Sequence, residues 1–219
     1  MKKILYLLIP CLFLLPSSCT MIVKGLAKSV VKGYNNHTDM NVSAFQLIDE
    51  KGDKHTFKDL FEGKTVYLYM WKDKNDRPPG EKDKKFTALK ERFHKYPDVV
   101  FADLYLGPDT THGSYRLADQ ELSAKLISDL KLISPAPFII GKDGKMLAYK
   151  GPKPTDNIVV DYVLFEARNG IDGTKSGKKL IRGVNSDQGF KTPALQAWYT
   201  DQFGKEYKSP VHFGISTTQ

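Results

Sequence analysis

Residues 60–71 read LFEGKTVYLYMW, and this stretch decides the fold of the chain. Its second half, Val66 to Trp71, is an unbroken apolar and aromatic run that precedes the polar stretch 72–85. Strands that are covered on both faces have such continuous runs, whereas half-buried strands alternate apolar and polar residues. We therefore predict that residues 66–71 form a central strand with further structure packed on both of its faces.

The segments around this strand alternate between strand-like and helix-like patterns. Apolar residues from Phe86 to Tyr96 recur at helical spacing and end at Pro97, which is typical of a helix with one buried face. Gly141 to Gly144 separates two short apolar runs, which predicts a hairpin. The predicted strands cover residues 45–48, 55–57, 99–106, 138–140 and 146–149, and the predicted helices cover residues 58–61, 86–96, 117–130 and 155–168.

This order of elements predicts an α/β domain over residues 42–168. The 219 residues, with 41% hydrophobic and 26% charged side chains, suit one soluble domain with appendages. Residues 169–219 are predicted to be a C-terminal extension. In it, Thr192 and Pro193 are suited to begin a short helix that ends at Phe203, and residues 179–184 are predicted to be a strand.

The N-terminal region has the layout of an export signal. Two lysines precede the apolar run 4–15, which is too short to span a bilayer comfortably. Cys19 follows two small residues and resembles the lipobox of bacterial lipoproteins, although Pro16 stands where an aliphatic residue is usual. We predict a signal peptide over residues 1–18 and acylation of Cys19, for example with palmitate. Cleavage of an ordinary signal peptide is the alternative.

Residues 19–41 are predicted to form a lipid-anchored tether. Lys24, Lys28 and Lys32 recur every four residues among apolar residues, which makes residues 20–32 amphipathic at helical spacing. One interpretation is a basic helix on the bilayer surface beside the anchor. The other is a plain tether, or an element packed on the domain. We expect the protein in the cell envelope, on the periplasmic face of the outer membrane rather than on the cell surface.

Four motifs occur in order along residues 42–168. Phe45–Asp49 with Gly52 resembles an F-x-L-x-D…G hairpin, and Leu60–Leu68 resembles L-x-G-K-x-V-x-L. Trp71 ends the central strand, and Pro135–Lys145 follows a P-T-x-F-L-I-D-x-D-G-K pattern. Together they resemble the thioredoxin-like superfamily, in its redoxin branch of alkyl-hydroperoxide-reductase-like and thiol–disulfide-oxidoreductase-like proteins. The resemblance implies a three-layer α/β sandwich with a central mixed sheet.

The resemblance also implies a reactive cysteine shortly after Trp71, at the start of the next helix. The first and second cysteine positions fall at about Asn75 and Pro78, and neither residue can attack a disulfide or a peroxide. The only cysteines are at positions 11 and 19, in the predicted export region. A cis peptide bond before Pro135, beside a groove for an extended peptide, is implied as well. We expect no catalytic residue, no cofactor and no metal site.

Two hypotheses on function follow from the missing thiols. The favoured one is a redox-inactive thioredoxin-fold envelope lipoprotein that binds a protein or peptide, or that acts as an accessory module. The alternative is a thiol–disulfide oxidoreductase or peroxidase-like redoxin that uses an unrecognised active group. The formal charge of +8, or +6 without Lys2 and Lys3, is diffuse, and we expect a membrane partner but no nucleic acid.

Overall fold

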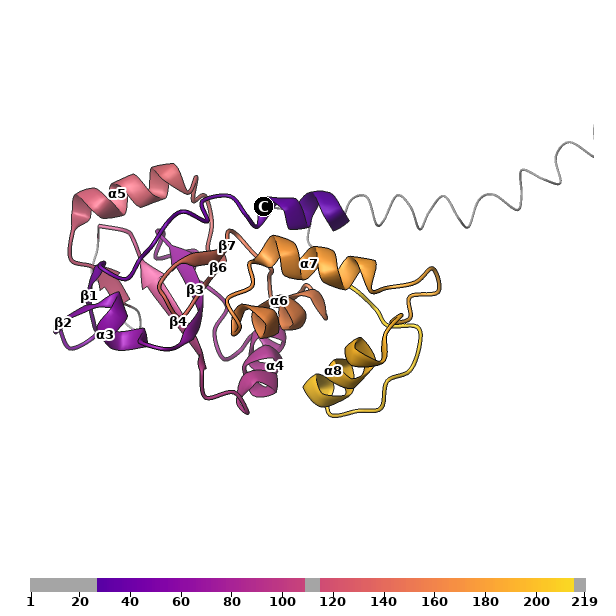
Figure 1. Ribbon diagram of the computed structural model, residues 1–219. Helices are drawn as coiled ribbons and strands as arrows, with labels where there is room; N and C mark the ends of the chain where they lie inside the picture. The colour runs from indigo at the N-terminus through magenta and orange to yellow at the C-terminus, as the bar shows by residue number, and fades with distance from the viewer. Residues whose placement is uncertain (1–26, 109–114, 215–219) are drawn as a thin grey trace, which may run out of the picture.

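A mixed sheet runs through the centre of this computed structural model, which describes residues 27–108 and 115–214 (Figure 1). The described residues form a seven-stranded sheet in the order β2-β1-β5-β4-β3-β6-β7. Strand β3 lies parallel to β4 and antiparallel to β6, which confirms the predicted mixed sheet. The strands are β1 (Gln46–Ile48), β2 (Lys54–Thr56), β3 (Thr65–Trp71), β4 (Val99–Tyr105), β5 (Tyr115–Leu117), β6 (Ala136–Ile140) and β7 (Met146–Ala148).

Strand β3 lies in the interior of the sheet, between β4 and β6, as its apolar run predicts. All seven of its residues are buried. Successive side chains of a strand point to opposite faces, and those of β3 divide between two hydrophobic clusters. Tyr67 and Tyr69 belong to one cluster, and Val66, Leu68 and Met70 belong to the other. The continuous apolar run is therefore explained by packing on both sides of the sheet.

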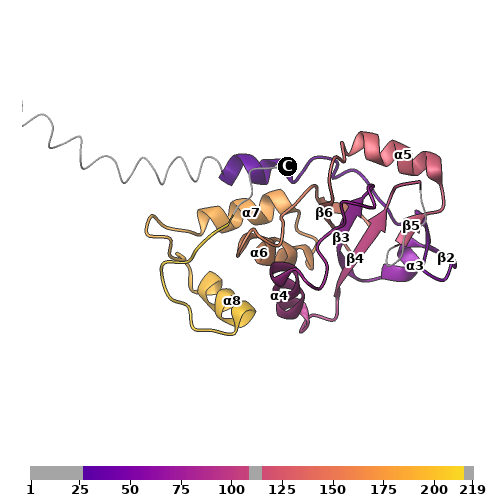
Figure 2. The ribbon, with the colours of Figure 1, turned by 180° about the vertical axis from the view of Figure 1, so that it is seen from behind.

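Helices cover both faces of the sheet. Helices α3 and α5 pack on the face of Val66 and Leu68, and α4 and α6 pack on the face of Tyr67 and Tyr69. Helix α7 packs alongside α6, and α8 lies farther from α5, at the other end of the molecule, as both views show (Figures 1 and 2). The predicted three-layer sandwich is confirmed. The helices are α3 (Phe57–Phe61), α4 (Lys84–Phe93), α5 (Gln120–Asp129), α6 (Val159–Ala167), α7 (Gly173–Arg182) and α8 (Pro193–Phe203).

Side-chain caps determine where several helices begin. Thr56 forms a capping box with Asp59 at the start of α3, and Asp119 accepts hydrogen bonds from the first turn of α5. Thr192 caps α8 with Pro193 in its first turn, and the helix ends at Gly204 with a φ of 62°. The predicted start and end of this helix are confirmed.

The structure differs from the prediction at three elements, of which one is helix α6, which begins at Val159 rather than at residue 155. Strand β5 occupies the start of the predicted helix 117–130, and α5 begins later because Asp119 caps it. The predicted strand 179–184 is wrong, because residues 173–182 form helix α7. Its buried residues Thr174, Gly177 and Ile181 recur at spacings of three and four. That spacing is typical of a helix. The adjacent apolar residues 180 and 181 instead suggested a strand in the sequence.

The N-terminal part of the described chain packs on the domain. Residues 27–33 form a helix, in which Val31 is fully buried, and Tyr34 behind it is 1% exposed. The hydroxyl of Thr174 in α7 donates to the carbonyl of Val31 at 2.7 Å. Both ribbon views show this helix alongside α7 (Figures 1 and 2). Of the interpretations given for residues 20–32, the packing of residues 27–32 therefore supports an element packed on the domain.

The segment after this helix follows the edge strand β7. The backbone amide of Met146 donates to Met40, and that of Tyr149 donates to Tyr34, at 2.9 and 3.0 Å. Edge strands expose unpaired backbone groups that other chains can pair with. Residues 34–42 therefore cover this edge of the sheet.

The C-terminal extension also belongs to the packed body. Trp198 and Tyr199 of α8 are each 8% exposed, and the Trp198 ring meets the Tyr162 ring of α6 edge-on at 4.8 Å. No helix within residues 27–108 and 115–214 has the length and apolar character needed to cross a bilayer. The predicted signal peptide and Cys19 lie outside the described residues.

An ion-pair cluster holds the β6–β7 turn to the end of α6. The Asp98 carboxylate accepts from Lys142 at 2.9 Å and from the Arg168 guanidinium at 2.9 Å. Burial by itself would raise the pKa of Asp98, but the hydrogen bonds from Lys142 and Arg168 outweigh it, so this pKa is lowered. The cluster therefore favours the ionised carboxylate of the folded state.

Candidate functional site

The carboxyl end of β3 is where the resemblance places the reactive residues. Trp71, the last residue of β3, is only 1% exposed, and its ring lies 4.6 Å from the Tyr105 ring of β4. Its indole Nε1 donates to the Asp103 carboxylate at 3.3 Å. The Arg77 guanidinium lies 5.9 Å from the Trp71 ring centre, at cation–π distance. Trp71 is therefore a core residue beneath the following loop.

The loop that follows contains the two positions that correspond to cysteines. Asn75 is exposed and Pro78 is half-buried, and neither lies in a helix. The Asp73 carboxylate accepts from the backbone amide of Asn75 at 2.9 Å, and the Asp73 carbonyl accepts from the amide of Asp76 at 3.0 Å. Such Asx turns are a local alternative to helix. The loop therefore carries these positions away from any helix terminus.

Helix α4 begins only at Lys84, and an aspartate caps it. The Asp83 carboxylate accepts from the backbone amides of Lys85 and Phe86, both at 2.9 Å. A helix N-terminus lowers the pKa of a cysteine because its free amides and dipole stabilise a thiolate. In this chain the first free amides of α4 donate to the Asp83 carboxylate instead. Sequence reasoning missed this cap, although Asp83 before an apolar helical pattern is a usual cap signal.

Pro135 lies at the same edge of the sheet, but its peptide bond is trans. In the described chain, the cis bonds are Gly151–Pro152 and Ser209–Pro210, so the cis bond predicted before Pro135 is wrong. A trans bond is preferred unless the fold requires the cis form. The chain bends at residues 133–134 and enters β6 at Ala136 without needing it.

The structure nevertheless brings Pro135 near the end of β3. Strands β3 and β6 pair with Met70 opposite Ala136, and the register continued by one residue places Pro135 opposite Trp71. Near it, the Ile133 side chain is 83% exposed. Among the described residues, Ile133 alone is a large hydrophobic residue with an exposed side chain. Ile133 was missed from the sequence. Its signal was an isoleucine in a connection between a helix and a strand, directly before Ser134 and Pro135.

The tyrosines of β3 give the site no base at neutral pH. The Tyr67 hydroxyl donates to the Pro152 carbonyl at 2.7 Å. Burial, with a further contribution from Tyr69, raises the pKa of Tyr67 well above its ordinary value. Burial also raises the pKa of Tyr69. Both phenols therefore stay protonated and cannot act as nucleophiles.

A separate cavity of about 430 Å³ lies between α4, α6 and the chain that follows α8. In its wall, the Asp161 carboxylate accepts from two nitrogens of Arg92, at 2.6 and 2.9 Å. The Gln202 amide donates to the same carboxylate at 3.1 Å. These polar groups satisfy one another and hold α8 to the sandwich. Across the described ranges, no group of three or more His, Cys, Asp or Glu residues is arranged to hold a metal ion.

Comparison with known proteins gives fold-level similarity. No family model and no curated protein matches the chain. A thiol-disulfide oxidoreductase from Bacteroides fragilis is 19% identical over 52% of this chain and 92% of its own, with a TM-score of 0.40. The thioredoxin domain of an oxidoreductase from Bacteroides vulgatus is 15% identical over 52% and 88%, with a TM-score of 0.35. An exposed lipoprotein thioredoxin from Streptococcus pneumoniae is 20% identical over 50% and 90%, with a TM-score of 0.33.

TM-scores of 0.40 and below carry no conclusion about this chain, so its class rests on its own architecture. The layers and the mixed sheet define the chain as an α/β protein with a three-layer sandwich. Within that class, its distinguishing features are the capped α4 terminus, the absence of cysteine after position 19, and a C-terminal extension packed on α6.

Proposed function

We propose that this protein is a redox-inactive, lipid-anchored thioredoxin-fold module of the bacterial cell envelope that binds an extended protein segment. The binding site is the rim where β3 ends and β6 begins. The observation that carries the proposal is that Asn75 and Pro78, at the expected cysteine positions, lie in a loop, and that the Asp83 carboxylate caps α4. Without a thiol, the scaffold keeps a recognition surface but has no group to transfer electrons.

The exposed residue Ile133 supports binding at this rim. A large apolar side chain that is 83% exposed costs free energy in water, and a bound chain would remove that cost. The hydrogen-bond ladders of β6 begin at Ala136, so residues 133–135 lie outside them. Extended peptides commonly bind by pairing with such backbone while a side-chain pocket provides specificity.

The envelope location rests on the N-terminal sequence. Two lysines, an apolar run and Cys19 have the order of a lipoprotein signal. We propose acylation of Cys19 after removal of residues 1–18, and attachment to the periplasmic face of the outer membrane. An intact-mass measurement on protein extracted from membranes tests this. A chain that begins at Cys19 and carries acyl groups is expected, and an unmodified chain with another N-terminus would contradict it.

Peptide binding is tested with a reduced and alkylated model protein that cannot refold. We expect saturable binding of this unfolded chain to the wild type, measured by fluorescence anisotropy. Ile133→Ser should weaken it about tenfold or more, since a buried isoleucine contributes about 1.5–3 kcal/mol. Gln120→Ser, at an exposed position of α5, is the control and should bind like the wild type. Equal binding by all three proteins would refute the proposed site.

A further inference from the structure

Helix 27–33 and helix α7 together expose a strongly basic face. The face is defined by Lys28, Lys32, Lys175, Lys178, Lys179 and Arg182. All are exposed except Lys178, which is half-buried, and neither helix contains an acidic residue. The ribbons place the two helices side by side on the outside of the molecule (Figures 1 and 2).

The apolar sides of both helices are already used for packing. A Cβ atom built on Gly177 would lie 2.5 Å from Val31, so the two helices touch at this glycine. Val31 and Leu180 are also part of the hydrophobic cluster that contains α6. Neither helix therefore has an apolar side left to insert into a bilayer, and only the cationic side remains for a partner.

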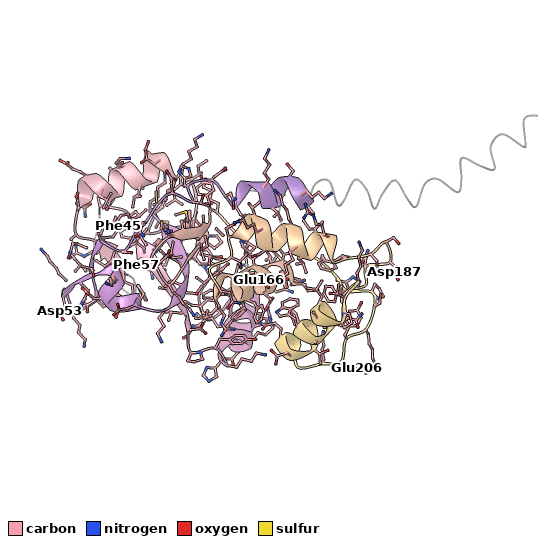
Figure 3. All side chains as sticks on the ribbon, in the orientation of Figure 1. Phe45, Asp53, Phe57, Glu166, Asp187 and Glu206 are labelled. Atoms are coloured by element: carbon pink, nitrogen blue, oxygen red, sulfur yellow. The ribbon has the colours of Figure 1, made fainter. Side chains whose placement is uncertain are left out.

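Two of the six cations are already paired within the protein. Lys179 donates to Glu166 of α6 at 3.0 Å, and Lys175 lies 3.2 Å from Asp172. Figure 3 labels Glu166 on the inner side of α7, and Asp187 in the loop beyond its C-terminal end. The other four cations are Lys28, Lys32, Lys178 and Arg182, and their charge on this face is not cancelled by an acidic residue of either helix.

We infer that this face binds the surface of an anionic phospholipid membrane through charge alone. Clustered lysines and arginines are attracted to anionic lipid headgroups, and the attraction decays within the Debye length. The inference extends the proposed envelope anchorage: Ala27 lies eight residues after Cys19, a stretch that spans at most roughly 30 Å. A basic face beside a lipid anchor adds an electrostatic attachment to the hydrophobic one.

The test uses a chain that starts at Thr20 and therefore carries no lipid. Both hydrophobic clusters consist of residues within 27–214, so this chain keeps every contact described above. We expect it to sediment with vesicles that contain 30% phosphatidylglycerol (about the anionic content that gives a strong surface potential), and not with pure phosphatidylcholine. Raising the salt from about 0.05 to about 0.5 M should release it, because the Debye length shortens.

Two charge-matched variants assign the binding to the face. Replacing Lys28, Lys32, Lys178 and Arg182 together by glutamine should weaken binding to anionic vesicles about tenfold or more. The control replaces four other exposed lysines by glutamine, and should change binding by about twofold at most, the effect of net charge alone. The control lysines are Lys51, Lys54, Lys85 and Lys90.

The possible outcomes are distinct. Equal losses in the two variants, equal binding to neutral vesicles, or no binding by the unlipidated wild type would each overturn the inference. Far-UV circular dichroism checks that both variants are folded, which is expected since the replaced side chains are exposed or half-buried. The result does not depend on acylation of Cys19 or on peptide binding at Ile133, so failure of either proposal remains distinguishable from failure of this one.

Discussion

The ion pair between Arg92 and Asp161 offers a quantitative test of how the C-terminal extension is held. The Asp161 side chain has no exposed surface, whereas the Arg92 side chain is 23% exposed, and the shortest distance between them is 2.6 Å. Arg92→Leu removes the cation but leaves the carboxylate buried. The Gln202 amide then remains as its donor, at 3.1 Å.

The expected cost follows from burial rather than from distance. Breaking a buried ion pair by removing one partner costs about 3–5 kcal/mol, because the remaining charge is uncompensated. Gln202 still donates to Asp161, so we expect about 3 kcal/mol for Arg92→Leu. Adding Asp161→Asn removes the buried charge and should restore about 1–2 kcal/mol of this loss. The loss is large against a total stability of about 5–15 kcal/mol.

The matched control is the ion pair between Lys95 and Asp201, which has the same shortest distance of 2.6 Å. Its side chains are 38% and 65% exposed, so Lys95→Leu should cost about 1 kcal/mol or less. Urea denaturation followed by circular dichroism measures all four proteins. Equal losses for Arg92→Leu and Lys95→Leu would refute the reasoning, and so would an Asp161→Asn change that deepens the Arg92→Leu loss.

Three further predictions concern packing, pH and the α4 terminus. Gly177→Val should lower the free energy of unfolding by about 1–3 kcal/mol, since the new side chain collides with Val31. Proteolysis of the N-terminal helix should become faster, and an unchanged stability would contradict this packing. Asp98→Asn should cost about 0.5–1 kcal/mol at pH 7. Because the pKa of Asp98 is lowered in the folded state, that difference should shrink as the pH falls below about 4 and disappear once the pH is below the lowered pKa; a difference that does not shrink with falling pH would exclude the ion pairs as its cause. Asp83→Cys should have a thiol pKa about one unit below that of Asn75→Cys, measured by alkylation rate against pH, and equal values would argue against the helix terminus at Lys84.

The sheet and the layers were predictable because their signals are local. The run from Val66 to Trp71 identifies a doubly covered strand without reference to the rest of the chain, and Thr192 before Pro193 marks a helix start in the same way. Helix α7 was not predictable locally. Its small residues, including Gly177, are explained by a helix that lies far away in sequence, around Val31.

The candidate site shows a similar division. The absence of a thiol can be predicted from the sequence, since Asn75 and Pro78 occupy the two positions where the resemblance implies cysteines. The place where α4 begins depends on the cap formed by Asp83, and the turn at Asp73 keeps the preceding residues out of a helix; neither was predicted. The isomer of the bond before Pro135 depends on how the chain enters β6, which only the tertiary structure specifies.

Reduction of insulin disulfides in the presence of dithiothreitol tests the absence of thiol chemistry most directly. The measurement uses the chain from Thr20, which contains no cysteine. We expect insulin to precipitate at the rate set by dithiothreitol alone, whether the protein is native or heat-denatured. A native sample that accelerates the reaction above the heat-denatured one would contradict the proposal that this scaffold only binds.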